Sequence, residues 1–373
     1  MCAATAGKRG RSVRVIDHAQ KPGRKILICG GGKCNFTNLQ VSSENYLSQT
    51  PQFCASALSR YSQWHFIELV RRYRIPYHER EHGQLFCNRT ARDILDLLLA
   101  ECQQARATFL MNTQIENIEC GRGFRIHTSR GAFECESLVI ATGSPAFPTA
   151  GATAFGYRVA EQFGLPMVAP RAGLVPFTLQ PKDKDVLATL SGIAVEAVIG
   201  NGRVSFRENL LLTHRGLSGP AALQMSSYWQ GEELTVNLLP GIDLYKKLQK
   251  YQAERPRQMV KSALTELLPK RLLEARLVDL SDLPLRNLTP KQAEEIAARL
   301  QEWRIKPGGT EGYRTAEVTV GGVDCAALSP KTFEVRTTPG LFFIGEVLDV
   351  TGQLGGYNLQ WAWSSGWCAG QAV

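Results

Sequence analysis

Short apolar runs alternate with amphipathic stretches along the chain, and this pattern predicts a mixed α/β fold. Strands are expected at residues 12–17, in several runs between 108 and 142, at 173–179, and at 315–320. Helices are expected at 51–73 and 90–105. The apolar runs that end in small residues, such as LVIATG at 138–143, would allow the backbone to approach a ligand closely.

The composition changes in the middle of the chain. Residues 186–239 predict several strands, with a hairpin turn at Asn201-Gly202. Residues 242–303 are highly charged and predict helices that prolines separate. We therefore expect a nucleotide-binding domain that is split in the sequence by a two-part insertion.

The block from Leu341 to Ala369 combines a strand, a glycine-rich turn and a helix. LFFIGEVLDV predicts the strand, TGQLGGYN the turn, and LQWAWSSGWCAG a helix with Asn358 near its start. Glu346 and Asp349 fall at the carboxyl end of the predicted strand, where open α/β sheets bind ligands. The helix start suits an anion or an electron-rich ring edge. The alternative interpretation is an ordinary βα unit without a ligand.

The N-terminal part carries a second set of candidate binding residues. A helix-compatible stretch precedes a strand that ends at Asp17, an arrangement typical of the second half of a dinucleotide-binding βαβ unit. Three consecutive glycines, 30–32, can expose a row of backbone N–H groups to a phosphate or flavin. Arg24, Lys25 and Lys33 add positive charge. A flexible turn is the alternative.

The composition of the chain bears on its cellular location more than on its function. The 373 residues are 44% hydrophobic, contain no run of 18 apolar residues, and include ten cysteines without a C-x-x-C pair. We expect neither a membrane span nor a zinc site nor a disulfide framework, and a cytoplasmic location. His78 and His82 are four residues apart, but they lie in a predicted loop and do not indicate a metal site. The net charge of +9 is spread along the chain, so we interpret it as solvated helix faces plus an anionic cofactor, and consider nucleic acid an unlikely partner.

Five motifs in order resemble the BaiN/YhiN-type flavoproteins, which are FAD-dependent oxidoreductases. The motifs are RKILICGGGKCNFTN, VIATG, AGLVPFTL, LLLTHRGLSGPAALQ and PGLFFIGEVLDVTGQLGGYNLQWAWSSG. The resemblance covers residues 1–373. It implies a Rossmann-like FAD/NAD(P)-binding domain from residues 1–185 and 315–373, a β-barrel-like insertion at 186–240 and a helical insertion at 241–314.

The resemblance also assigns the cofactor-binding residues. Asp17 resembles the ribose-binding acid, Ile115 lies on the strand near the adenine, and the carboxylates lie near the ribityl chain. The full set is Asp17, Arg24, Lys25, Gly30, Gly31, Gly32, Ile115, Ala141, Thr142, Gly143, Glu346, Asp349, Gly356, Tyr357 and Asn358.

Three departures from the family pattern stand out. The family's first strand and its G-x-G-x-x-G motif are absent from this sequence, so roughly 10–20 further residues are expected before Met1. The present chain is expected to bind FAD poorly, to express poorly, or to show a gap or a substituted strand in the sheet centre. Ser144 stands where the family usually has glycine, and Lys33 where it usually has arginine.

The sequence predicts an FAD-dependent oxidoreductase that acts on an unidentified small molecule between the FAD domain and the insertion. His214 and Arg215 are the candidate catalytic residues, although a loop-capping role for His214 is equally compatible with the sequence. NAD(P)H is expected as a possible electron donor, and the pattern indicates no particular oligomeric state. The alternatives are a flavin-assisted RNA-modifying or nucleic-acid-binding protein, or an N-terminally truncated inactive form.

Overall fold

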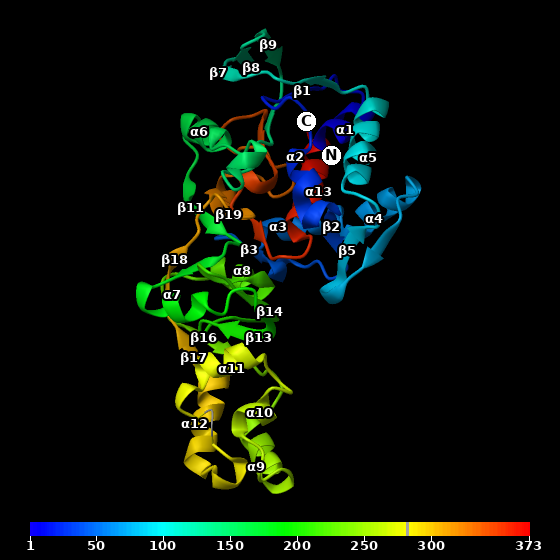
Figure 1. Cartoon of the computed structure of the whole chain (residues 1–373). Helices are drawn as coiled ribbons and strands as arrows, with labels where there is room; N and C mark the ends of the chain where they lie inside the picture. Colours follow the sequence, from blue (N-terminus) through cyan, green and yellow to red (C-terminus); the bar gives the residue numbers. More distant parts are fainter. Residues whose placement is uncertain (281–282) are drawn as a thin grey trace. The chain divides into compact units, whose positions relative to one another are not determined.

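A computed structural model of the chain describes residues 1–280 and 283–373, and it confirms the mixed α/β class (Figure 1). The chain forms two compact units. Unit 1 contains Met1–Arg171 and Val318–Val373, and unit 2 contains Ala172–Glu317. Among the described residues, no helix is long and apolar enough to cross a membrane.

Parallel strand pairs form the nucleotide-domain part of unit 1. β1 (Arg14–Ile16) pairs with β6 (Thr108–Leu110), and β10 (Leu138–Ile140) pairs with β20 (Leu341–Phe343). In the described part of the chain these are two separate two-stranded sheets rather than one continuous sheet. β20 is shorter than predicted because Gly345, at φ 73°, turns the chain into the 3₁₀ helix η8 (Gly345–Val347).

Helices pack closely on one another in unit 1. A Cβ on Gly370 of α13 (Tyr357–Gly370) would lie 2.6 Å from the Cβ of Thr5 in α1 (Cys2–Lys8), so glycine lets these helices approach. The helix predicted at 51–73 is two helices, α3 (Phe53–Arg60) and α4 (Gln63–Arg72). The break falls at Tyr61, which leaves helical geometry (φ −135°, ψ 83°), and Ser62 caps α4.

The remaining helices and strands of unit 1 surround these elements. Two small antiparallel sheets have the orders β2-β5-β4 and β7-β8-β9, and two further strand pairs are β21-β3 and β11-β19. The bounds are α2 (Arg24–Ile28), β2 (Asn35–Asn38), β3 (Tyr46–Leu47), β4 (Tyr77–Glu79), β5 (Gln84–Cys87), α5 (Arg92–Gln104), β7 (Ile115–Cys120), β8 (Phe124–Thr128), β9 (Gly131–Cys135), α6 (Phe155–Gln162), β11 (Met167–Gly173), β19 (Val318–Val323) and β21 (Thr351–Gly352).

Unit 2 is built on a seven-stranded sheet of order β17-β16-β13-β14-β15-β12-β18. Its two edge strands, β17 (Trp303–Ile305) and β18 (Pro307–Thr310), are separated in sequence by Lys306 alone. The chain therefore passes directly from one edge of the sheet to the other. The other strands are β12 (Phe177–Leu179), β13 (Ala194–Gly200), β14 (Ser205–Leu212), β15 (Gly216–Ser218) and β16 (Leu234–Asn237).

Helices and sheet in unit 2 share one hydrophobic core. The core joins Phe177 and Leu210 of the sheet to Leu248 and Leu300 of the helices. The helices are α7 (Pro181–Ala188), α8 (Gly219–Ser226), α9 (Leu244–Glu254), α10 (Val260–Leu264), α11 (Lys270–Arg276) and α12 (Pro290–Gln301). Because β12 pairs with β15 and β18, residues 172–185 group with unit 2, whereas the sequence pattern placed them in the nucleotide domain.

A buried carboxylate ties three helices of unit 1 together. Glu101 of α5 is 5% exposed, and its carboxylate accepts hydrogen bonds from Arg72 (2.8 Å), from the Tyr73 hydroxyl (2.7 Å) and from the Lys8 ammonium. Burial alone would raise the pKa of Glu101, but the hydrogen bonds from Lys8 and Tyr73 outweigh it and hold the pKa below its ordinary value.

Replacing Glu101 with glutamine is expected to lower the free energy of unfolding by about 1–3 kcal/mol at neutral pH, because a buried charged acceptor is lost. The folded-state pKa is depressed, so this stabilisation is present above the unfolded-state pKa of about 4.3 and is lost as the pH falls through the lower folded-state value. Urea denaturation of both proteins at pH 7 and pH 3 tests this. If the two proteins differ in unfolding free energy by as much at pH 3 as at pH 7, the prediction is contradicted.

Candidate functional site

Glu346 is the point at which predicted cofactor residues from distant parts of the chain meet. Its carboxylate accepts from Lys25 of α2 at 2.5 Å, from the Ser144 hydroxyl at 2.9 Å and from the backbone N–H of Thr319 at 3.3 Å. Glu346 follows β20 and Ser144 follows β10, so the carboxyl ends of two paired parallel strands meet here. This is the edge at which open α/β sheets bind ligands.

The end of β1 lies beside the same group of contacts. Arg24 donates to the Thr149 carbonyl at 2.9 Å, and the His18 ring lies 3.1 Å from the Gly151 carbonyl. Asp17 follows β1 and accepts from the backbone N–H of Ala19 at 2.8 Å, with its side chain 39% exposed. The contacts thus place Asp17 and the pair Arg24-Lys25 around the loop that follows β10.

The backbone after β10 is open to solvent. Ala141 and Thr142 are exposed, and a Cβ on Gly143 would lie 4.0 Å from Glu346 Oε2. Ile115 begins β7, and the Thr113 N–H two residues earlier donates to the Asp17 carbonyl at 3.0 Å. Exposed backbone at a strand end can approach a planar ligand closely.

The three consecutive glycines form a left-handed turn. Gly30, Gly31 and Gly32 have φ values of 58°, 63° and 81°. A Cβ on Gly31 would meet no atom within 4 Å. Successive N–H groups in this geometry form a concavity for an anion. Lys33 does not add its charge to this concavity as predicted, because its ammonium donates to the carbonyls of Asn88 and Arg89 at 2.9 and 2.6 Å.

The start of α13 is held by residues that follow the glycine turn. Asn38 donates to the Gly355 carbonyl at 2.9 Å, and Asn35, with its amide oxygen facing Gly356, accepts from the Gly356 N–H at 3.1 Å. Gly355 and Gly356 have φ values of 123° and 95°. Asn358 closes the preceding turn through two 2.8 Å hydrogen bonds to Gly352.

Tyr357 and Asp349 are more buried than a ligand-facing role requires. Tyr357 is 7% exposed, and its carbonyl accepts from the Tyr46 hydroxyl at 3.0 Å. Asp349 is 3% exposed and accepts from the Gln49 N–H at 2.7 Å. Burial raises the pKa of Asp349, and the Gln49 hydrogen bond partly opposes this. Of the two predicted carboxylates, Glu346 is the one joined directly to other predicted cofactor residues.

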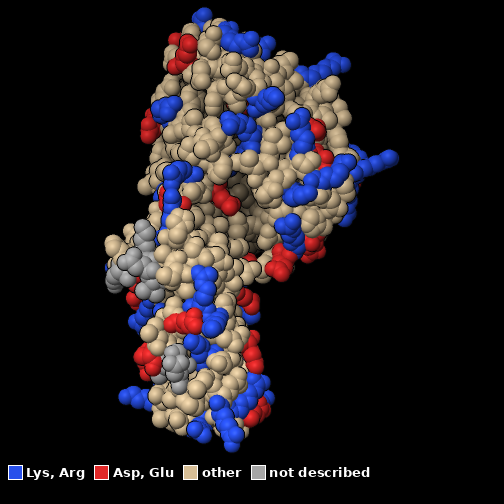
Figure 2. Space-filling view, in the orientation of Figure 1, with Lys and Arg blue, Asp and Glu red and all other residues tan. Residues whose placement is uncertain are grey.

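The residues present fit a flavin dinucleotide. The concavity at Gly30–Gly32 and the N-terminus of α13 offer backbone N–H groups to phosphate or to an electron-rich ring. Glu346 and Asp17 offer carboxylate oxygens to hydroxyl groups. Figure 2 shows that the face of unit 1 carrying α2 is hollowed, with an acidic side chain in the hollow and basic side chains near its rim.

His214 and Arg215 lie in unit 2, between β14 and β15, outside the contacts described above. Arg215 lies 3.5 Å from Glu311. Their catalytic role stays a prediction. His78 bonds with Asn88 at 2.7 Å, and the described residues contain no group of three potential metal ligands.

Sequence reasoning missed several residues of the site. Ser144 was noted only as a departure from glycine, yet it bonds to Glu346 and accepts from the Thr319 hydroxyl at 2.9 Å. Asn35 and Asn38 position the start of α13. Their position in CNFTN, directly after the glycine turn, could have indicated the two asparagines from the sequence.

The family model described as the HI0933-like protein Rossmann domain matches residues 1–372. The chain is 52% identical over 376 residues to the ribosomal RNA dihydrouridine synthase of Escherichia coli, covering 99% of this chain and 94% of that protein. It is 46% identical to the Haemophilus influenzae protein of the same name, covering 100% and 95%. It is 27% identical to the 3-dehydro-bile acid delta(4,6)-reductase of Clostridium scindens, covering 100% and 95%.

These relatives correct two sequence-based predictions. The prediction of a small-molecule substrate is wrong, because the relatives at 52% and 46% identity are named for a modification of ribosomal RNA. The prediction that nucleic acid is an unlikely partner is wrong for the same reason, and the RNA-modifying alternative is favoured. The resemblance to BaiN/YhiN-type flavoproteins and the assignment as an enzyme are confirmed.

The match over residues 1–372 and the identity over 99% of the chain establish the family. The chain belongs to the HI0933-like family, whose members are flavoproteins with an FAD-binding Rossmann domain.

Proposed function

We propose that this protein is an FAD-dependent ribosomal RNA dihydrouridine synthase, which reduces the C5–C6 double bond of uridine in ribosomal RNA. The observation that carries the proposal is the 52% identity to the Escherichia coli enzyme over 99% of this chain. Because ribosomes occupy the cytoplasm, that is also the proposed location of this protein.

The chemistry suits a flavin. The C5–C6 bond of uracil is conjugated to the C4 carbonyl, so C6 accepts hydride and negative charge moves toward the carbonyl oxygen. FAD bound at this site would supply the hydride in its reduced form, and we propose NADH or NADPH as the source of its electrons. A proton must then reach C5, and a side chain or water in the site would deliver it.

The chain's own residues would hold and tune the cofactor. Backbone N–H groups at Gly30–Gly32 and at the start of α13 would stabilise negative charge. Lys25 and Glu346 would anchor the strand ends around the cofactor through their 2.5 Å ion pair. Asp17 would accept hydrogen bonds from ribose hydroxyls.

The charge of the chain supports an RNA substrate. Unit 1 contains 23 Lys and Arg residues against 17 Asp and Glu residues, so it accounts for +6 of the chain's net charge of +9. Phosphate contacts from such residues supply most of the sequence-independent affinity for nucleic acid. We therefore propose that some of these basic residues, first interpreted as solvated helix faces, contact RNA phosphates.

Complementation tests the proposal. Escherichia coli cells without their own enzyme would express this chain, and the dihydrouridine content of their ribosomal RNA would be measured by mass spectrometry of nucleosides. Restoration of dihydrouridine is expected. A purified chain that carries bound FAD but restores no dihydrouridine would reject the assignment.

A further inference from the structure

A groove of about 560 Å³ lies on unit 1 and shares no lining residue with the contacts around Glu346. It is lined by residues of α1, α4, α5 and α13, together with the short segments that join them to their neighbours. Its volume falls in the range of ligand pockets, about 300–1,000 Å³. The reaction proposed at the flavin does not assign a function to this groove.

Aromatic rings line one side of the groove. Tyr61 stacks on Trp367 with centroids 5.6 Å apart and on His65 with centroids 5.4 Å apart. Trp64, on the first turn of α4, lines the same groove and is 56% exposed. Among the described residues, Trp64 is one of five large apolar side chains that are exposed. An exposed aromatic ring offers a face on which a nucleic-acid base can stack.

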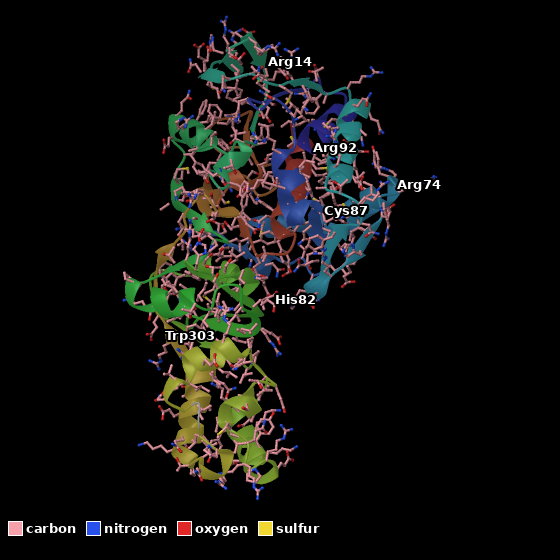
Figure 3. The ribbon with its side chains drawn as sticks, viewed as in Figure 1. Arg14, Arg74, His82, Cys87, Arg92 and Trp303 are labelled. Carbon is pink, nitrogen blue, oxygen red and sulfur yellow. The ribbon has the colours of Figure 1, made fainter. Side chains whose placement is uncertain are left out.

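Basic side chains surround these rings. Lys8, Arg9 and Arg72 line the groove, and the Arg60 guanidinium lies 5.5 Å from the centroid of Trp367. Glu68 and Glu101 are the carboxylates of the lining, so three basic side chains face two acidic ones. Lys8 and Arg72 hydrogen-bond to Glu101, and Arg9 donates to the carbonyls of Gly370 and Val373 at 2.9 and 2.8 Å. Arg74, just after α4, projects at the edge of unit 1 outside the groove lining (Figure 3).

We propose that this groove binds unpaired nucleotides of the RNA substrate, with one base stacked on Trp64 and phosphates near Arg72 and Arg9; this rests on the proposed function. Stacking on aromatic rings beside a cationic track is how proteins bind single-stranded RNA. An acidic peptide would use the cations, but it has no planar face for the exposed indole. The groove therefore serves as an anchoring site on RNA beyond the reacting uridine.

Fluorescence anisotropy with a labelled, single-stranded 12-nucleotide RNA and the flavin-loaded protein tests the groove. Trp64→Leu keeps an apolar side chain but removes the ring, and it is expected to weaken binding about 5- to 100-fold, the loss of one stacked base. Trp64→Phe, which keeps a ring, is expected to bind within about threefold of the unsubstituted protein. Because Trp64 is on the surface, both variants should fold, as their flavin absorbance would verify.

Charge is tested separately. Arg72→Gln is expected to reduce the slope of log affinity against log salt concentration by about 0.7, the value for one phosphate contact on a single strand. The matched control is Arg74→Gln, a basic residue next to α4 but outside the groove, which should change the slope less. RNA affinity that is unchanged in Trp64→Leu would overturn the proposal. Displacement of the RNA by polyglutamate with the same dependence on Trp64 would also overturn it, in favour of a protein-binding site.

The complementation assay separates this proposal from the proposed function. If dihydrouridine is restored by the unsubstituted chain but Trp64→Leu binds RNA normally, the groove proposal alone fails. If no dihydrouridine is formed while Trp64→Leu still loses RNA affinity, the proposed reaction fails and the groove remains an RNA-binding surface.

Discussion

Replacing Gly356 with alanine is expected to abolish flavin binding and to lower the free energy of unfolding by more than about 4 kcal/mol. A Cβ at this position would lie 2.5 Å from the carbonyl oxygen of Thr37 and 2.8 Å from the side-chain amide of Asn35. The first of these atoms belongs to the backbone of β2 and cannot rotate away. The residue also has φ 95°, a conformation that costs a side-chain-bearing residue about 1–2 kcal/mol.

The reason for so large an effect is the position of Gly356 at the N-cap of α13. An alanine at this position would push the start of α13 away from β2. The backbone N–H groups proposed to face the flavin would move with the helix. Urea denaturation followed by circular dichroism measures the stability, and visible absorbance measures the bound flavin.

Gly10 provides the matched control. It has a similar φ of 88°, but a Cβ there would meet nothing within 4 Å. Gly10→Ala should therefore cost only the conformational strain, about 1–2 kcal/mol, and should keep its flavin. If the Gly356 variant behaves like the Gly10 variant, the close approach of α13 to β2 is not what forms the site.

Replacing Glu346 with glutamine is expected to weaken FAD binding by about 10- to 100-fold. The carboxylate accepts from Lys25, Ser144 and the Thr319 N–H, and a glutamine NH₂ group cannot accept from any of them. At least one donor is left without its partner, and the charge-assisted hydrogen bonds that are lost contribute about 1.5–3 kcal/mol. Titration of the apoprotein with FAD, followed by flavin fluorescence, measures the affinity.

Two glutamate-to-glutamine variants serve as controls for this experiment. Glu136 pairs with Arg11 on the surface and its side chain is 86% exposed, so its replacement should change neither stability nor FAD affinity. Glu101→Gln should lower stability without changing FAD affinity, because its partners are Lys8, Arg72 and Tyr73. An FAD affinity of Glu346→Gln equal to that of the Glu136 variant would show that Glu346 does not support the flavin.

The sequence by itself determined the fold class and the local elements of the site. Apolar runs ending in small residues predicted β10 and β20, and Asp17 was correctly placed at the end of a strand. The glycine turn was predictable because three adjacent glycines allow positive φ without help from the rest of the protein. The β-barrel-like and helical insertions were predicted from family motifs and a change of composition, and they stay a prediction.

The tertiary structure decided which of these residues act together. Lys25 and Glu346 are 321 positions apart, and Asn38 and Gly355 are 317 apart, so no local pattern could join them. It also decided that Lys33 bonds to Asn88 and Arg89 rather than facing the glycine turn. Local propensity fixes where a strand or turn forms, whereas the direction of a long charged side chain depends on partners that only folding brings near.

The partner was the hardest feature to derive from the sequence. A net charge of +9 spread along 373 residues indicates no surface, because the basic residues that matter are neighbours in space. Lys8 of α1, Arg72 of α4 and the rings of Trp64 and Trp367 reach one groove only after α1, α4 and α13 have packed. Hydrophobic patterning indicates which side of each helix is buried. The surface proposed to bind RNA combines side chains of several helices, so it forms only when the protein folds.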